Sequence, residues 1–140
     1  MKKLALWAAL AASLFAGVAY AATIIRTDDN VGMAGAAYQV GPIIDQAVAA
    51  TVTSDVIEMK VLSGMSVQVD HGNVVGTLAL QSSNDNTTYY AVQGGSFAAI
   101  SGAGGEMVEI KDLTSRFYRF VYTHSSGTGV LKVIPYVKGK

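Results

Sequence analysis

Hydrophobic and polar residues alternate along short stretches of the chain beyond residue 54. Ile57 and Met59 alternate with Glu58 and Lys60, which is the period-two pattern of a strand with one buried face and one solvated face. Glycine, asparagine, serine or aspartate interrupts such stretches about every eight to twelve residues, a spacing typical of all-β domains. The pattern predicts seven strands, at residues 56–62, 66–70, 76–82, 89–92, 106–111, 117–123 and 129–137.

Turn-forming residues separate these predicted strands. Segments 71–73, 83–86, 101–105 and 125–129 are rich in glycine, asparagine and serine, which predicts loops. Seven or eight antiparallel strands in a single open sheet would leave an apolar face in water. We therefore expect an all-β fold, an antiparallel β-sandwich of jelly-roll type.

Two of the predicted strands have distinct characters. Segment 117–122 is apolar or aromatic on both faces apart from Arg119, which predicts a central strand. We expect Arg119 to pair with Glu109 or Asp112 rather than to bind a ligand. The last predicted strand contains Pro135, which has no backbone N–H to donate, and this predicts a strand at the edge of the sheet.

The N-terminal residues have the order of an export signal. Lys2 and Lys3 precede an apolar run at 4–17, and residues 19–21 place alanine on both sides of a tyrosine. This order predicts a signal peptide cleaved before Ala22. The alternative is an uncleaved membrane anchor, because no charge interrupts the apolar run. Either way, we expect a hydrophobic N-terminal helix ahead of the sandwich.

The chain thus divides into three predicted parts. Residues 1–21 form the signal peptide or anchor, residues 22–54 form an arm with short strands, and residues 55–140 form the sandwich domain. Within the arm, segment 43–50 also has apolar residues at helical spacing, so a short helix there is an alternative. The run is short and β-branched residues follow it, which favours strands instead.

Composition excludes several classes of function. The chain has 140 residues, no cysteine and a formal net charge of zero. The absence of cysteine removes disulfide scaffolds, thiol nucleophiles and thiolate metal sites. The absence of a basic excess argues against a nucleic-acid partner. Without residues 1–21 the chain keeps eight basic and ten acidic residues, which describes a mildly acidic domain.

No motif in the sequence predicts a reaction centre. His124 is followed by Ser125, but neighbouring residues on a strand point to opposite faces, so the two do not predict a catalytic dyad. Turns at Asp28 and Asp29 and at Asp85 offer oxygens that suit calcium, yet neither has the spacing of a helix-loop-helix calcium site. We therefore expect no enzyme activity, no cofactor, and no catalytic, cofactor-binding or metal site, with calcium at these turns left open.

Two separated motifs resemble a known class of protein. Residues 75–85 read VGTLALQSSND and are followed by Tyr89 and Tyr90, while residues 117–123 read FYRFVYT and residues 126–131 read SGTGVL. In this order the motifs resemble those of the small β-sandwich modules, jelly-roll or discoidin-like, of bacteriophage virion structural proteins. The resemblance covers about residues 50–140. It implies a sandwich fold and a structural function without catalysis.

Two functions follow as expectations. The first is a non-enzymatic structural or assembly protein, either a virion surface component (decoration or minor capsid protein) or a secreted fibre-like component, which acts through protein–protein contacts as a homo-oligomer or within a virion. Its expected location is the periplasm, the cell surface, the extracellular space or the virion, with membrane contact only through residues 1–22 if these are uncleaved. The alternative is a secreted carbohydrate-binding β-sandwich module that binds a surface glycan. The tyrosines available for stacking on a sugar are Tyr89, Tyr90, Tyr118, Tyr122 and Tyr136.

Overall fold

The computed structural model describes residues 24–26, 37–39, 41–59, 62–97 and 99–139, and these form an all-β structure. No helix occurs among them, and the predicted N-terminal helix and the Asp28–Asp29 turn lie outside the described residues. The strands are β1 (Ile24–Arg26), β2 (Ala37–Gln39), β3 (Ile44–Val48), β4 (Val52–Thr53), β5 (Val56–Glu58), β6 (Leu62–Ser83), β7 (Tyr90–Ser96), β8 (Ile100–Lys111), β9 (Phe117–Gly127) and β10 (Gly129–Gly139).

Strand β6 organises the whole sheet. β8 and then β7 pair with one of its edges, while β10 and then β9 pair with the other. Beyond β9 and β10, the short strands β2 to β5 follow one another along the outer side of this pair. All of these pairings are antiparallel, and only β1 with β5 is parallel. The described strands therefore form one sheet, antiparallel except for β1 beside β5, built around a 22-residue strand.

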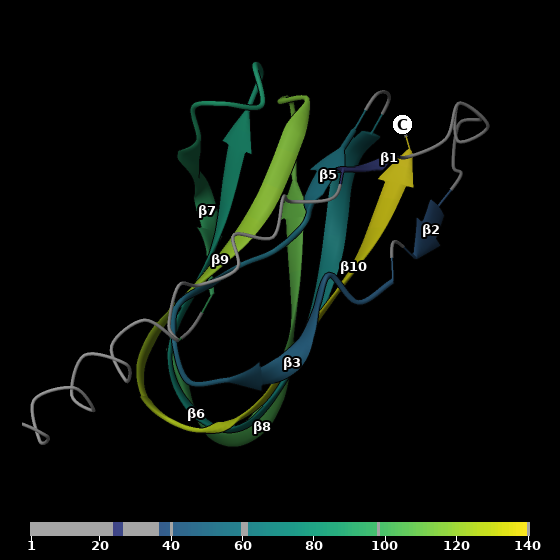
Figure 1. The fold of residues 1–140 in the computed structure, drawn as a ribbon. Helices are drawn as coiled ribbons and strands as arrows, with labels where there is room; N and C mark the ends of the chain where they lie inside the picture. Colours follow the sequence, from purple (N-terminus) through teal and green to yellow (C-terminus); the bar gives the residue numbers. More distant parts are fainter. Residues whose placement is uncertain (1–23, 27–36, 40, 60–61, 98, 140) are drawn as a thin grey trace, which may run out of the picture.

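This sheet curls back on itself, as Figure 1 shows. The bend falls in the middle of β6, near the start of β8, and where β9 ends and β10 begins. In β6 the bend coincides with a bulge between His71 and Val74, where the strand contains one residue more than its partner β8. An extra residue moves the side chains that follow to the opposite face. Because the bend and the bulge coincide, Val69 before the bulge and Leu78 after it both face the interior.

Glycines allow the strands to lie close together near this bend. A Cβ atom on Gly129 would lie 2.7 Å from the backbone N of Asn73, and one on Gly127 would lie 2.5 Å from the Asn73 carbonyl oxygen. Gly127 also has a φ of 79°, which favours glycine. The sequence SGTGV thus provides the close approach between the end of β9, the start of β10 and the middle of β6.

The two halves of the curled sheet enclose one hydrophobic core. Val67 and Val133 come from one half, and Phe120 and Tyr122 come from the other, all fully buried in the same cluster. The rings of Phe97 and Phe120 pack with their centres 5.8 Å apart, within the range of favourable aromatic contacts. The fold is therefore sandwich-like, as the alternation of residues predicts.

Several local predictions were wrong. The alternative helix at 43–50 is the strand β3, because its backbone pairs with β10 from Val133 opposite Ile44 to Gly129 opposite Val48. The loops predicted at 71–73 and 101–105 lie inside β6 and β8, where glycine accompanies a bend rather than a chain reversal. The loop predicted at 125–129 is reduced to Thr128, since β9 continues to Gly127 and β10 starts at Gly129.

The positions of β9 and β10 in the sheet test two further predictions. The turn at 83–86 is confirmed, and so is the central position of β9 between β6 and the strands β4 and β5. The edge position of the last strand was wrong, because β10 lies between β6 and the strands β2 and β3. Ile43 N–H donates to Val133 O, so the backbone groups of residue 133 point toward β2 and β3 rather than toward β6. Those of residue 135, two positions later, point the same way. Pro135 faces the interval between β2 and β3, where no strand pair among the described residues needs its missing N–H.

Candidate functional site

A compact turn joins β6 to β7 at one end of the sheet. One carboxylate oxygen of Asp85 accepts hydrogen bonds from the backbone N–H groups of Thr87 and Thr88, both at 2.9 Å, and from the Ser83 hydroxyl at 2.7 Å. The Ser83 oxygen in turn accepts the backbone N–H groups of Asp85 and Asn86. Asn86 has a φ of 59°, which asparagine tolerates better than most residues. The sequence SNDNTT thus folds into a turn stabilised by its own side chains.

These hydrogen bonds explain the acidity of Asp85. The backbone N–H groups of Thr88 and Thr87 and the Ser83 hydroxyl stabilise its ionised form, which holds the pKa of Asp85 well below its usual range. The same three donors give the carboxylate a structural function. Among the described residues, no group of three or more histidine, cysteine, aspartate or glutamate side chains could hold a metal ion.

Behind the turn, Arg119 and Tyr89 form a stacked pair. The Arg119 guanidinium lies over the Tyr89 ring at 3.9 Å from its centre, and its Nε donates to Gln81 Oε1 at 2.9 Å. The Tyr89 hydroxyl donates to the side-chain oxygen of Asn86. The predicted pairing of Arg119 with Glu109 or Asp112 was therefore wrong, because these contacts on β6 and after β6 engage its charged group instead.

The loop between β8 and β9 lies at the same end of the sheet as this turn (Figure 1). Its Arg116 backbone N–H donates to the Asn84 side-chain oxygen, and its Ser115 N–H donates to the Tyr118 hydroxyl. The Arg116 side chain forms a hydrogen-bonded ion pair with buried Glu58, the shorter contact being 2.6 Å. These bonds attach the loop to both the turn and the core.

Between this turn and this loop lies a hollow of about 310 Å³, which we call the end hollow. It is lined by Ser82, Ser83, Asn84, Asp85, Thr88, Tyr90 and Ser115. The lining contains hydroxyl groups, one amide, one carboxylate and one aromatic ring. Tyr90 is 70% exposed, the largest exposure among the large hydrophobic residues described. The end hollow therefore combines a free aromatic face with many hydrogen-bonding groups.

A second candidate surface lies on the outer face of β8, β6 and β10. Residues directly opposite one another across the three strands form rows, and every second residue of a strand points to the same face. The rows are Lys111, Gly64 and Lys138; Glu109, Ser66 and Tyr136; Met107, Gln68 and Ile134; and Gly105, Asp70 and Lys132.

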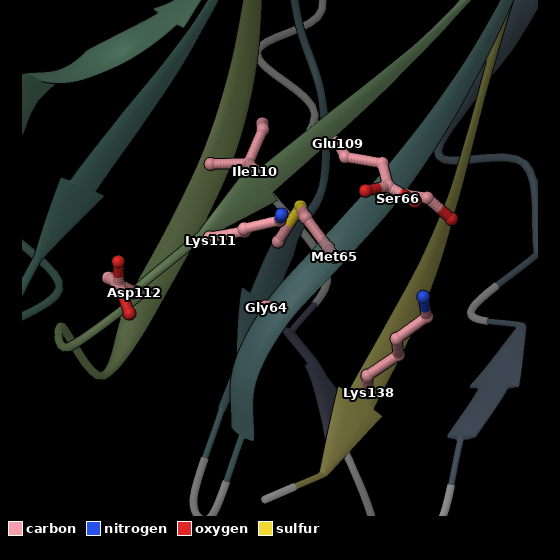
Figure 2. Close-up of a pocket in the computed structure, with 8 residues that line it drawn as sticks. All are labelled: Gly64, Met65, Ser66, Glu109, Ile110, Lys111, Asp112 and Lys138. Atoms are coloured by element: carbon pink, nitrogen blue, oxygen red, sulfur yellow. The ribbon is translucent and has the colours of Figure 1, made fainter.

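This set of rows, called here the four-row face, combines apolar and charged side chains. Met107 is 63% exposed and Tyr136 is 40% exposed, and together with Ile134 they line a hollow of about 240 Å³. Toward one end, Figure 2 shows Glu109, Ser66 and Lys138 projecting from three neighbouring strands. A further hollow of about 300 Å³ lies beside them. Exposed apolar groups surrounded by charges of both signs are typical of contact surfaces.

The edge of the sheet next to this face is long. β8 pairs with β6 from Lys111 to Ile100, and its other side has no strand partner within the described ranges. The opposite edge is divided among β1 to β5 and so offers no continuous ladder. An unpaired edge of 12 residues is a template to which another strand can be added.

The five candidate tyrosines have different fates. Tyr118 and Tyr122 are buried in the core, where burial raises the pKa of each hydroxyl. Tyr89 is half-buried beneath Arg119, which leaves Tyr90 and Tyr136 as the exposed rings of the predicted set. The period-two pattern could have predicted that Tyr122 is buried while residues 121 and 123 are not. It does not reveal that Tyr90 lies past the end of the core.

The two histidines contact groups other than a serine hydroxyl. His71 Nδ1 lies 2.7 Å from the Gly102 carbonyl oxygen, and His124 Nδ1 lies 3.4 Å from the Tyr122 hydroxyl. Ser125, which follows His124 in the chain, is exposed, and among the described residues no hydrogen bond joins the two side chains. The sequence analysis missed the exposure of Met107 and the ion pair between Glu58 and Arg116. Nothing in the local pattern indicates what lies beside Met107 or which residue pairs with Glu58.

No helix among the described residues is long and apolar enough to cross a membrane.

Comparison with known proteins gives little support for any assignment. No family model matches the sequence, and no curated protein matches it. Among solved structures, the chain is similar to the pre-peptidase C-terminal domain of a collagenase from Bacillus anthracis, with 13% sequence identity and a TM-score of 0.38. The alignment covers 81% of this chain and 93% of that domain.

Proposed function

We propose that this chain is a non-enzymatic structural protein that assembles through protein–protein contacts, and that its partner on the four-row face is a second copy of itself. The observation that carries the proposal is the exposure of Met107 beside Ile134 and Tyr136 on one face of three adjacent strands. Removing such apolar groups from water is the main driving force of association.

The charges of the four-row face suit a two-fold contact. Lys111 and Lys138 lie in the first row, while Asp70 lies in the fourth row beside Lys132. Lys132 is itself paired with Asp45, at 3.7 Å. A two-fold axis parallel to the rows and between the two middle ones would place Asp70 of one copy across from Gly64 of the other, between its Lys111 and Lys138. Met107 and Ile134 would then lie across from Glu109 and Tyr136 of the other copy. A two-fold interface requires this kind of self-complementarity.

The free edge of β8 supports assembly in a second way. The strand is continuous over 12 residues and borders the four-row face. Contacts between copies can therefore use the four-row face in one interface and the β8 edge in another.

The finer assignments follow as part of the proposal. The curled sheet fits a jelly-roll type β-sandwich, and the motifs at 75–85 and 117–131 support a component of a phage virion, either a decoration or a minor capsid protein. A secreted fibre-like subunit fits the predicted export signal at 1–21 equally well. The order of lysines, apolar run and alanines supports export from the cytoplasm.

Sedimentation equilibrium of the purified full chain tests the proposal. We expect a dimer or larger species for the wild type and a shift toward monomer for Met107→Glu. Tyr90→Ala is the matched control, since Tyr90 is similarly exposed but lies outside the four-row face. A monomeric wild type at all concentrations would refute the proposal.

A charge exchange then tests the two-fold arrangement. Asp70→Lys and Lys138→Asp should each weaken association, and the double variant should recover most of the loss. Equal effects of the single and double changes would rule out the proposed pairing of rows.

A second candidate function, the binding of a glycan, is favoured by one specific observation. This is the exposed Tyr90 ring beside the hydroxyl-rich end hollow.

A further inference from the structure

The end hollow occupies the point where the inner face of the sheet passes out of the core. Ser82 of β6 lies opposite Tyr90 of β7 on one side and opposite Tyr118 of β9 on the other. Tyr118 is buried, Ser82 is half-buried and Tyr90 is exposed, so this row leads from the core to solvent. A ligand seated on the row would contact an apolar ring at one side and the polar turn at the other.

The groups around the hollow favour a neutral ligand. Apart from the Asp85 carboxylate, its lining side chains are uncharged. The two nearby cations are already engaged, Arg116 with Glu58 and Arg119 with Gln81. An anion would therefore meet a carboxylate without a free cation, whereas hydroxyl groups would find both donors and acceptors.

The end hollow is also held in shape before a ligand arrives. The turn is fixed by five hydrogen bonds among residues 83–88, and the facing loop is attached through Arg116 N–H to Asn84. When a site is already ordered, less of the free energy of binding is spent on ordering its side chains and loops. Its volume of about 310 Å³ is at the small end of ligand pockets, which suits a single ring.

We propose that the end hollow binds one pyranose ring of a neutral glycan, with the apolar C–H face of the sugar on Tyr90 and its hydroxyl groups on Ser82, Thr88 and Ser115. Asp85 contributes as an acceptor, because a carboxylate has about four lone-pair positions. This inference deepens the second candidate function and is independent of the contact proposed for the four-row face.

Saturation-transfer difference NMR on the full chain tests the site, because it observes the ligand and tolerates large assemblies. The probes are the methyl glycosides of glucose, galactose, mannose and N-acetylglucosamine. At least one should receive saturation, most strongly on the ring protons of one face. Tyr90→Ala should weaken binding of that probe about tenfold, the equivalent of an aromatic contact.

Two further variants make the result specific. Tyr136→Ala removes an exposed tyrosine on the four-row face and should leave binding unchanged. Thr88→Val removes one hydroxyl from the hollow but keeps the backbone N–H that Asp85 accepts, so it should weaken binding without changing the thermal midpoint. No saturation of any probe would overturn the inference, and so would binding that survives Tyr90→Ala. Neither result would affect the sedimentation test of assembly.

Discussion

Replacing Gly76 by alanine should strongly destabilise the sheet next to its bend. A Cβ atom at this position would lie 2.4 Å from the backbone oxygen of Thr123 and 2.6 Å from the ring of Tyr122. Both neighbours belong to β9, which pairs with β6 on this side. Because the nearer atom is backbone, no side-chain rotation can relieve the clash.

The magnitude follows from the two contacts. Forcing an extra methyl group into a packed interior costs about 1–3 kcal/mol. Displacing the Tyr122 ring also weakens its hydroxyl hydrogen bond to Val75 O, at 3.0 Å, which contributes about 1 kcal/mol. We expect Gly76→Ala to lower the free energy of unfolding by about 3 kcal/mol and the thermal midpoint by about 10 °C.

Urea titration followed by far-ultraviolet circular dichroism measures this change. Gly104→Ala is the matched control, because its Cβ would first meet the His71 ring at 3.3 Å, which is a side chain able to adjust. The control should change stability by less than about 1 kcal/mol. A loss below about 1 kcal/mol for Gly76→Ala, or equal losses for both variants, would refute the steric account of the bend.

Three further predictions concern single side chains. Ser54→Ala should cost about 1–3 kcal/mol in urea titration, because the buried Ser54 hydroxyl oxygen accepts the Phe120 N–H at 2.9 Å; an unchanged midpoint would contradict it. Arg119→Met should cost about 0.5–1 kcal/mol through its lost contact with Tyr89, and a stabilised variant would argue against that contact. The lowered pKa of Asp85 stabilises the fold above the ordinary value of 3.8, and this contribution is lost as the pH falls below it. Asp85→Ala should therefore flatten the acid side of the stability profile, and carbon-detected NMR should show the carboxylate still ionised below pH 3.8; an ordinary titration would disprove it.

The alternation of residues predicts the strands and the core because burial on one face of a strand has a local signature. Val67 and Val69, and later Leu78 and Leu80, are all inward and buried. The same signature cannot show that these two pairs belong to one strand. The inward positions are odd before His71 and even after Val74, which locally resembles two strands separated by a loop.

The candidate surfaces depend on pairings that no local pattern contains. Met107 and Ile134 are neighbours only because both lie beside Gln68 in the folded sheet. Tyr90 and Tyr122 both lie in predicted strands, but one lies beyond the end of the core and the other inside it. The turn at Asp85 is different, since its hydrogen bonds lie within six residues and its sequence alone indicates it.

The glycines show why a sequence that forms a bend within a strand resembles one that forms a loop. A strand that continues through a sharp bend needs close backbone approach, as at Gly129, or a positive φ, as at Gly127. A chain reversal needs the same freedoms, so glycine alone cannot separate the two. The distinction comes from the partner strands. Gly104 lies opposite His71, and Gly102 and Gly127 both lie opposite Val74. Glycine-rich segments far apart in sequence therefore meet at one line across the sheet, and along that line a curled sheet can turn back while its strands stay paired.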